Sequence, residues 1–401
     1  MLKNKFYMRL LIIGVFIRLL VMPFYFHPDI KTYHFQSSFL KTGVINIYKY
    51  LDENKQELPL KDEFVYFPLT YLTLGSYQAI VNPILGEGFN DWLYDASQQS
   101  VERVGIYRYL LVLKFPYLLF DIAVAVLLVL MFSKKKKQRM AFTLWMFNPI
   151  TIALIYMYAN VDIIPVFFTL LSIYLVQKKS KLWGAVSLGI AAGFKAYPLL
   201  FMPFIIFKGN DVKEKLLIFI SGFGTFLVIV APFLSTSFQK ASLVSGLTTR
   251  IVSYGMSLGF GEIIMPAIVA ITIIYFLALE GRGKLIIQYL SVLLIIFSFI
   301  HIHIQWLLWA MPFLVYLYVS ERKLRPVVVI ITVAAFAIPL LYNDRFMNVS
   351  LLQAYSYYFN LVPTPFVILR KVFDPFILQG VLHSIFAAGS IYVVWKGFVK
   401  K

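Results

Sequence analysis

Apolar runs long enough to cross a lipid bilayer recur along nearly the whole chain. A helix needs about 20 residues to span a hydrocarbon layer of about 30 Å. Charge, Pro, Gly or a polar turn bounds each run. We predict spans near residues 7–26, 107–132, 140–158, 161–177, 215–234, 263–279, 285–302, 304–319, 326–341 and 376–395. The sequence therefore predicts an all-α polytopic membrane protein in which residues 1–401 form a single integral membrane domain.

Composition supports this prediction and excludes other classes. Hydrophobic residues make up 60% of the chain and charged residues 14%, whereas a soluble protein has about 25% charged residues. A water-soluble globule is therefore excluded. Cysteine is absent, which excludes a disulfide framework, a thiolate nucleophile and a cysteine metal cluster.

The positive charge of the chain follows its membrane topology. The net charge is 37 − 19 = +18, which in principle could indicate nucleic acid, a membrane surface or an acidic substrate. Cytoplasmic loops, however, retain Lys and Arg. Alternating the spans puts 21 of the 37 basic residues on one side: Lys3, Lys5, Lys134–Lys137, Arg139, Lys178, Lys179, Lys181, Lys208, Lys213, Lys215, Arg282, Lys284, Arg322, Lys323, Arg325, Lys396, Lys400 and Lys401. We predict a plasma-membrane protein with both termini cytoplasmic and no nucleic-acid partner.

Two longer segments are predicted on the other side. Residues 27–106 hold ten of the nineteen acidic residues and form an external loop with juxtamembrane helices. Residues 342–375, rich in Tyr, Phe and Pro, form a second external segment.

The segment 182–207 does not fit simple alternation. It is apolar, has basic clusters at both ends and contains a Gly193–Pro198 stretch in its middle. Two half-helices that meet inside the membrane would fit, and such irregular backbone is tolerated only in protein or beside a wet cavity. One long helix kinked at Pro198 is the alternative.

Ionisable residues within spans are costly, so each is a candidate functional residue. The candidates are Arg18, Lys114, Asp121, Asp162, Lys195, His301, His303 and His383. Asp29 joins them because it lies just outside the first span, where a carboxylate could take a proton from a hydroxyl. Alternatively, Asp29 is only a helix N-cap, since it follows Pro28 and precedes a helix-like run.

The stretch from His301 to Pro312 marks a turn between two spans. His303, Gln305 and Trp306 offer N–H donors and a flat apolar face, which suit an anionic or sugar ligand. Two histidines two residues apart do not share a helix face, which argues against metal chelation by this pair. A belt of interfacial Trp with buried histidines is the alternative.

Three further charged residues have two interpretations each. Arg250, in the outer segment 235–262, could clamp a phosphate or could simply be solvated. Asp162 opens a span and could cap its helix. Asp121 could pair with Lys114, or with a residue on another helix.

Several short motifs occur in a familiar order. They are Asp29-x3-Tyr33, Tyr66-Phe67-Pro68-Leu69-Thr70, Pro116 with Asp121, Asn148-Pro149 with Asn160-x-Asp162, Lys195-x-Tyr197-Pro198, and Gln305-Trp306-x-x-Trp309. Over residues 1–320 the chain thus resembles GT-C-fold glycosyltransferases that use polyprenyl-phosphate sugars. It especially resembles mannosyltransferases similar to the first GPI-anchor mannosyltransferase and the related prokaryotic mannosyltransferases. The resemblance implies about 10–12 transmembrane helices and an external helical loop after the first span.

The resemblance also implies a reaction. An inverting enzyme would move a hexose, with mannose expected, from a polyprenyl-phosphate carrier to a lipid or glycan acceptor on the extracytoplasmic face. Asp29 would be the general base. The substrates would be bound by His303, Arg250, Lys195, Gln305, Trp306, Tyr33, Asp162 and Tyr66.

One motif departs from the family pattern. Where GPI-type enzymes have Asp-x-Asp, this chain has Asp29-Ile30-Lys31. Loss of the second carboxylate weakens the case for a divalent metal, so we predict no cofactor and leave a metal as an open alternative.

Two other functions remain open. The segment around Lys195 and the intramembrane charges would also suit a transporter or flippase of a lipid-linked or small anionic substrate. The absence of an internal repeat argues against it, because alternating-access folds usually contain two related halves. A catalytically inert membrane scaffold is the remaining possibility.

Overall fold

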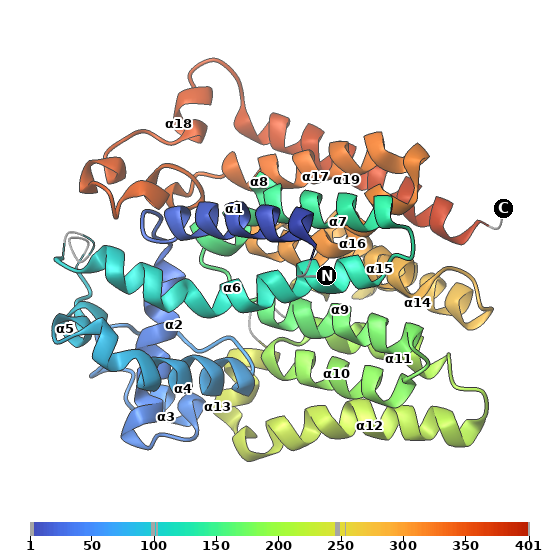
Figure 1. Cartoon of the computed structure of the whole chain (residues 1–401), viewed down its shortest axis with the longest axis horizontal. Coiled ribbons are helices and arrows are strands. Elements are labelled where there is room, and N and C mark those ends of the chain that lie inside the picture. Colours follow the sequence, from blue (N-terminus) through green and yellow to red (C-terminus); the bar gives the residue numbers. More distant parts are fainter. Residues whose placement is uncertain (1–3, 98–100, 102, 245–248, 253, 400–401) are drawn as a thin grey trace.

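The structure, a computed structural model, describes residues 4–97, 101, 103–244, 249–252 and 254–399. Its α-helices (Figure 1) are α1 Lys5–Val21, α2 Pro28–Ser38, α3 Ile47–Glu53, α4 Pro68–Leu85, α5 Gly88–Tyr94, α6 Ile106–Leu130, α7 Lys135–Phe147, α8 Pro149–Ile152, α9 Ile163–Gln177, α10 Lys181–Phe194, α11 Met202–Ile206, α12 Val212–Val230, α13 Thr236–Phe238, α14 Pro266–Leu279, α15 Leu285–Phe299, α16 Leu307–Ser320, α17 Arg325–Leu340, α18 Pro365–Leu369 and α19 Pro375–Phe398. Within the described residues, extended structure is confined to one hairpin, β1 Met256–Gly259 with β2 Glu262–Ile264. The all-α prediction is confirmed.

Helices occupy each of the ten predicted spans. Among the described residues, four helical stretches are long and apolar enough to cross a membrane: Ile106–Leu130, Val212–Phe233, Arg322–Leu340 and Pro375–Phe398. A fifth is the pair Lys135–Phe147 and Pro149–Met157, which is bent by 47°. Six further apolar helices are 10–17 residues long. The polytopic membrane character is confirmed, while the count of 10–12 spans stays a prediction.

The segment 182–207 is broken, as the two-half-helix interpretation predicted. Helix α10 ends at Phe194 because Lys195 is extended, with φ −158° and ψ 144°. A short 3-10 turn, Tyr197–Phe201, then leads into α11. The carbonyl oxygen of Phe194 accepts hydrogen bonds from the Phe67 amide (3.2 Å) and the Thr70 hydroxyl (3.2 Å) at the start of α4. The alternative of one continuous kinked helix is wrong. The two hydrogen bonds connect the break to the predicted external loop.

The elements of residues 27–106 gather at one end of the helical bundle. Helices α2, α3, α4 and α5 lie there in Figure 1, with α18 and the loops of residues 342–375 nearby. The start of α1 and the end of α19 point toward the opposite end.

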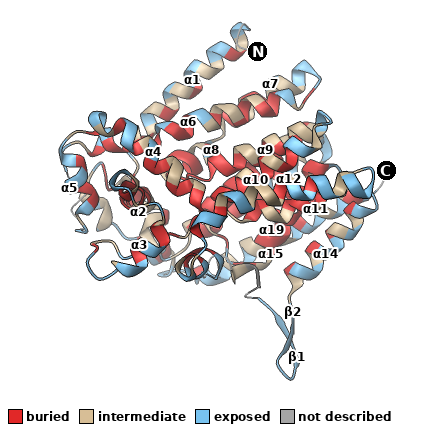
Figure 2. Ribbon diagram, turned by 90° about the horizontal axis from the view of Figure 1, so that it is seen from below, coloured by how far each residue is buried: buried red, intermediate tan, exposed pale blue. Residues whose placement is uncertain are grey.

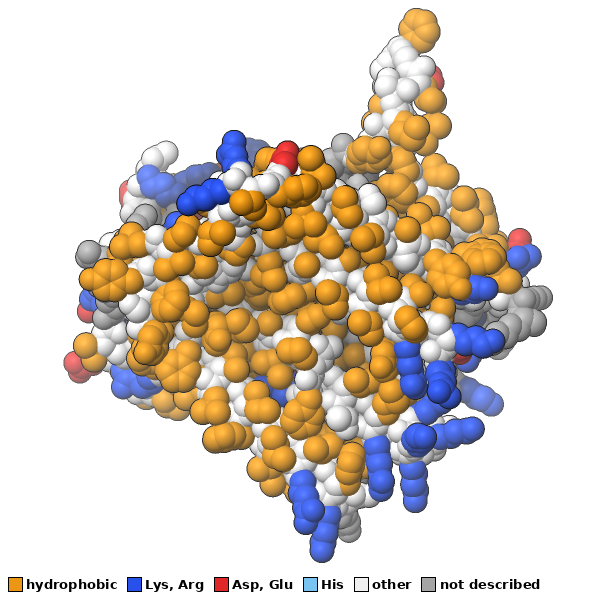
Figure 3. All heavy atoms as spheres, turned by 90° about the horizontal axis from the view of Figure 1, so that it is seen from above, with side chains coloured by type: hydrophobic (Ala, Val, Ile, Leu, Met, Phe, Trp, Pro, Cys, Tyr) orange, Lys and Arg blue, Asp and Glu red, His pale blue; other side chains and the backbone are white. Residues whose placement is uncertain are grey.

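Basic side chains gather at that opposite end. In Figure 3 they border a broad apolar face. Lys3, Lys400 and Lys401 lie outside the described residues. This distribution agrees with the predicted sorting of charge, while the side of the membrane on which each end lies stays a prediction.

A buried ion pair ties the first helix to its neighbours. Arg18 Nε of α1 donates to Asp121 Oδ2 of α6 at 2.5 Å, and neither side chain is exposed. The same carboxylate accepts from Trp145 Nε1 (2.6 Å) and the Tyr156 hydroxyl (2.7 Å). Asp121 therefore pairs with a residue on another helix and not with Lys114, which donates to the carbonyl oxygens of residues 22 and 25. These bonds fix the end of α1, from which α2 begins.

Burial is greatest in the middle of the bundle. Figure 2 shows buried residues along α6, α9, α10 and α15, whereas the β1–β2 hairpin projects away from the helices. All residues of both strands are exposed. The hairpin thus lies outside the core that positions the cavity described next.

Candidate active site

A polar cavity of about 770 Å³ lies among α2, the loop before α4, the break after α10 and the turn before α16. It collects residues that are far apart in the sequence. Its walls are formed by Pro28, Asp29, Thr32, Tyr33, Gln36, Lys55, Lys61, Asp62, Glu63, Val65, Tyr66, Lys195, Arg250, His303, Gln305 and Trp306. Eight of the nine candidate site residues from the sequence are in this set.

Asp29 lies in the first turn of α2 and does not cap it. The N-cap is His27, whose Nδ1 accepts from the Asp29 amide at 3.3 Å. The interpretation of Asp29 as a mere N-cap is therefore wrong. Its carboxylate is 31% exposed, because it faces the cavity.

Three neighbours hold the Asp29 carboxylate. Oδ2 accepts from the Tyr33 hydroxyl (2.6 Å) and from Gln305 Nε2 (2.8 Å). Oδ1 lies 3.5 Å from His27 Nδ1. With two donors on Oδ2, Oδ1 is the oxygen better placed to accept a proton from a ligand.

Asp29 is ionised at neutral pH. Burial by itself would raise its pKa, but the nearby His27 and the hydrogen bonds from Tyr33 and Gln305 outweigh burial, so the pKa lies below its usual value. A carboxylate with a lowered pKa is ready to act as a base.

Tyr33 and Tyr66 extend this hydrogen-bond network. The Tyr66 hydroxyl donates to the Tyr33 hydroxyl at 2.9 Å, and the two rings pack edge to face. Burial raises the pKa of both hydroxyls well above the usual value. Both side chains therefore stay neutral and serve as hydrogen-bond donors.

His303 faces Asp29 from the turn before α16. Burial lowers the pKa of His303 to about 4, although Asp29 opposes this shift. Its Nδ1 is buried and has no hydrogen-bond partner among the described residues. At neutral pH His303 therefore offers a hydrogen bond and no positive charge. His301 points elsewhere and stacks on Tyr342 at 4.4 Å.

Arg250 and Lys195 line the cavity together with two further basic residues, Lys55 and Lys61. The guanidinium of Arg250 lies 5.5 Å from the centre of the Trp306 ring. Lys195 Nζ lies 4.4 Å from the centre of the Tyr66 ring. Aromatic faces of this kind stabilise cations through their quadrupole.

Asp162 lies behind Lys195 and is not among the residues that line the cavity. It accepts from Lys195 Nζ at 2.9 Å and from Trp309 Nε1 at 2.7 Å. Asp162 is the N-cap residue of α9, as one interpretation expected, but its side chain makes no cap hydrogen bond. Asn160 completes the motif, because its Nδ2 donates to the Gln305 carbonyl at 2.8 Å. The Asn-x-Asp motif thus positions Lys195 and Gln305.

An apolar groove adjoins the cavity. It measures about 290 Å³ and is lined by Val65, Phe67, Lys195, Ala196, Tyr197, Leu199, Leu200, Ser242, Ile296, Trp306 and Trp309. Lys195 and Trp306 belong to both hollows. A ligand with a charged head and an apolar tail could therefore occupy both at once.

Some site features were not found from the sequence. His27 was not predicted as a site residue. Lys61, Asp62 and Glu63 were not predicted either, because they lie in a loop whose sequence has no recognisable motif. The N-cap position of His27 before Pro28 was an available signal. Within the described residues no group of three His, Asp or Glu side chains could hold a metal ion, and the expectation on metals stays a prediction.

Fold and site together define a multi-pass helical membrane protein with a carboxylate-bearing cavity beside an apolar groove. A family model described as Glycosyltransferase family 87 matches residues 111–253. Among curated proteins, GPI mannosyltransferase 1 of Candida albicans is 22% identical over 153 residues, which cover 37% of this chain. The match spans 36% of that relative's length.

Both matches, each over about a third of the chain, show similarity to glycosyltransferases. The matched residues 111–253 include Asp162, Lys195 and Arg250, whereas Asp29 and His303 lie outside them.

Proposed function

We propose that the protein is an inverting glycosyltransferase that moves a hexose, with mannose expected, from a polyprenyl-phosphate carrier to an acceptor hydroxyl. The reaction would take place on the extracytoplasmic side. Asp29 accepts the proton of the acceptor hydroxyl, whose oxygen attacks the sugar C1. The bond from C1 to the carrier phosphate breaks, and the configuration at C1 inverts.

The leaving phosphate needs positive charge and hydrogen-bond donors. Arg250 and Lys195 supply the charge, and His303 donates from a neutral ring. A carrier with one phosphate requires no metal in this arrangement. Tyr66 and Trp306 hold these two cations at the cavity wall through their rings.

One observation carries the proposal: a single cavity holds an ionised Asp29 with Arg250 and Lys195, and it opens beside an apolar groove. The groove suits the prenyl chain while the cavity suits the phosphate and sugar. This pairing of hollows favours a lipid-linked donor over a soluble nucleotide sugar.

The proposal is tested with full-length protein in nanodiscs and a synthetic polyprenyl-phosphate mannose. We expect Asp29→Asn to lower transfer by at least about 100-fold, because it removes the base and keeps the shape of the side chain. Asp91→Asn, an exposed acid in the same external region, serves as the control and should retain activity. Mass spectrometry of lipids that co-purify with the protein should detect a polyprenyl phosphate.

Full activity of a correctly folded Asp29→Asn protein would refute this mechanism. Counterflow of the lipid-linked sugar across vesicles without a covalent product would favour the transporter alternative, for which the broken segment at Lys195 is the structural reason.

A further inference from the structure

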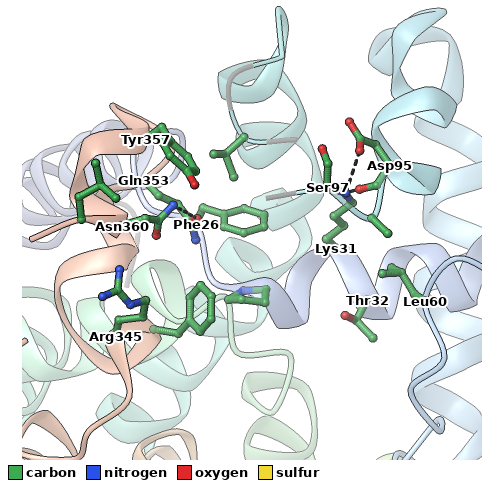
Figure 4. A pocket seen from close by; sticks show the side chains of 15 residues that line it. Phe26, Lys31, Thr32, Leu60, Asp95, Ser97, Arg345, Gln353, Tyr357 and Asn360 are labelled. Atoms are coloured by element: carbon green, nitrogen blue, oxygen red, sulfur yellow. Dashed lines mark hydrogen bonds between the residues drawn. The ribbon is translucent and has the colours of Figure 1, made fainter. Parts of the chain in front are cut away.

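A second cavity, of about 470 Å³, lies on the other side of α2 (Figure 4). Its walls come from α2, from the loop after α5 and from the segment 342–375. They include Phe26, Lys31, Thr32, Leu60, Arg345 and Gln353. Nothing in the mechanism above uses this cavity.

The second cavity borders the Asp29 cavity directly. Pro28 and Thr32 line both. Leu60 lines the second cavity, and its neighbour Lys61 lines the first. The first turn of α2, which carries Asp29, is therefore the wall between the two hollows.

The second cavity has an excess of positive charge. Lys31 is 6% exposed, donates to the Asp95 carbonyl oxygen and lies 5.4 Å from the centre of the Trp92 ring. Burial lowers the pKa of Lys31 to about 8, so it stays charged at neutral pH. The Asp95 carboxylate, the acid of this wall, is paired with Arg103 at 2.9 Å. Arg345 on the facing wall has no carboxylate partner among the described residues.

Two amide side chains in the wall each have one polar atom without a hydrogen-bond partner among the described residues. Gln353 is 4% exposed, and its Nε2 is buried without a hydrogen-bond partner among the described residues. Asn360 Oδ1 also has no hydrogen-bond partner among the described residues. The other two atoms of the pair are bonded to each other, because Asn360 Nδ2 donates to Gln353 Oε1 at 3.0 Å. Buried polar groups are normally satisfied, because an unpaired one loses its hydrogen bonds to water without replacement. An unpaired donor beside an unpaired acceptor indicates a ligand with hydroxyl groups.

We propose that the second cavity binds the acceptor of the reaction and that this acceptor is a glycan bearing a negative charge. Arg345 binds its carboxylate or phosphate, Gln353 and Asn360 bind sugar hydroxyls, and Lys31 adds positive charge from the opposite wall. The inference that the bound glycan is the acceptor rests on the proposed function. The glycan reaches past Thr32, so that one hydroxyl meets the carboxylate of Asp29.

Binding is measured first, without any reaction. Glucose 6-phosphate and glucose are titrated into full-length protein in phosphatidylcholine nanodiscs, with detection by saturation-transfer NMR. We expect the phosphate ester to bind and glucose to bind at least about tenfold more weakly, since hydrogen bonds to a charged group are stronger than those between neutral groups. Arg345→Gln should remove this preference. Arg282→Gln at the opposite end, a matched arginine in an exposed ion pair, should not.

A second variant guards against misfolding. Gln353→Glu has nearly the same shape and adds a negative charge, so it should also weaken binding of glucose 6-phosphate while thermal stability is monitored. Equal binding of glucose and glucose 6-phosphate, or unchanged binding in both variants, would overturn the proposal. The proposal would also be overturned if neither glucose 6-phosphate nor the phosphatidylglycerol of a nanodisc bound at the site.

The source of the anion follows from the two probes. Binding of glucose 6-phosphate in phosphatidylcholine nanodiscs indicates a glycan recognised without its lipid. Loss of that binding in nanodiscs that contain phosphatidylglycerol indicates that the site takes an anionic lipid headgroup. Asp29→Asn should abolish transfer and still prefer glucose 6-phosphate over glucose in the binding assay, which separates this proposal from the proposed mechanism. In transfer assays with an anionic acceptor, Arg345→Gln should raise the acceptor KM and leave the donor KM unchanged. An equal rise in both would contradict the assignment to the acceptor.

Discussion

Two hydrogen bonds to one oxygen of Asp29 link its geometry to its charge. The donors are Tyr33, one helical turn away, and Gln305, which is 276 residues away in the sequence. Asp29 could be found from its place after the first span. The hydrogen bond from Gln305 to Asp29 could not be predicted from the sequence, because it depends on how the turn before α16 packs against α2.

These bonds lead to a prediction for the pH dependence of transfer. The pKa of Asp29 is lowered, so the base is charged above this value and activity declines only as the pH falls through it. Tyr33→Phe removes a donor to the charged form, and it should therefore raise this pKa and move the acid limb of kcat/KM to higher pH.

The matched control is Tyr77→Phe. Tyr77 donates to the Val112 carbonyl, outside the cavity, so its loss should leave the pH profile in place. An acid limb that stays put in Tyr33→Phe would show that this hydrogen bond does not set the pKa of the base.

Among the elements, α1 is held by its buried ion pair with α6. Removing one partner of a buried pair leaves an uncompensated charge and costs about 3–5 kcal/mol. We therefore expect Asp121→Asn to lower the thermal midpoint of the protein in detergent by several degrees, and to impair transfer through the position of α2.

The pair Lys181–Glu214 offers the comparison, because its side chains are 19% and 30% exposed. Partly solvated pairs contribute about 0–1 kcal/mol, so Glu214→Gln should change the midpoint little. Similar losses in both variants would mean that burial of the Arg18–Asp121 pair is not what stabilises α1.

Element boundaries followed from the sequence where the signal was local. Runs of apolar residues bounded by charge predicted the helices of the bundle, and the Gly193–Pro198 stretch predicted the end of α10. Local signals could not predict that the free Phe194 carbonyl is satisfied by α4, nor that the segment 342–375 supplies Arg345 to a cavity beside α2. Both depend on long-range packing.

The orientation of the whole molecule can be tested because the chain has no cysteine. Single cysteines at exposed positions then report the side of the membrane. We expect Glu53→Cys, on α3, to react with an impermeant maleimide in intact cells, since external acidic loops face outward in this topology.

Lys136→Cys, at the start of α7, should react only after the membrane is permeabilised. If Lys136→Cys were labelled in intact cells and Glu53→Cys were not, the protein would have the opposite orientation and the cavity would face the cytoplasm.

Several apolar helices near the cavity are short for a membrane crossing. Helix α14 has 14 residues and α15 has 15, and at 1.5 Å per residue they extend about 21–23 Å, against about 30 Å of hydrocarbon. A bilayer accommodates such hydrophobic mismatch by local thinning. The headgroup region beside α14 would then sink toward the middle of the membrane, and a carrier phosphate diffusing in that leaflet would arrive nearer to the level of Arg250.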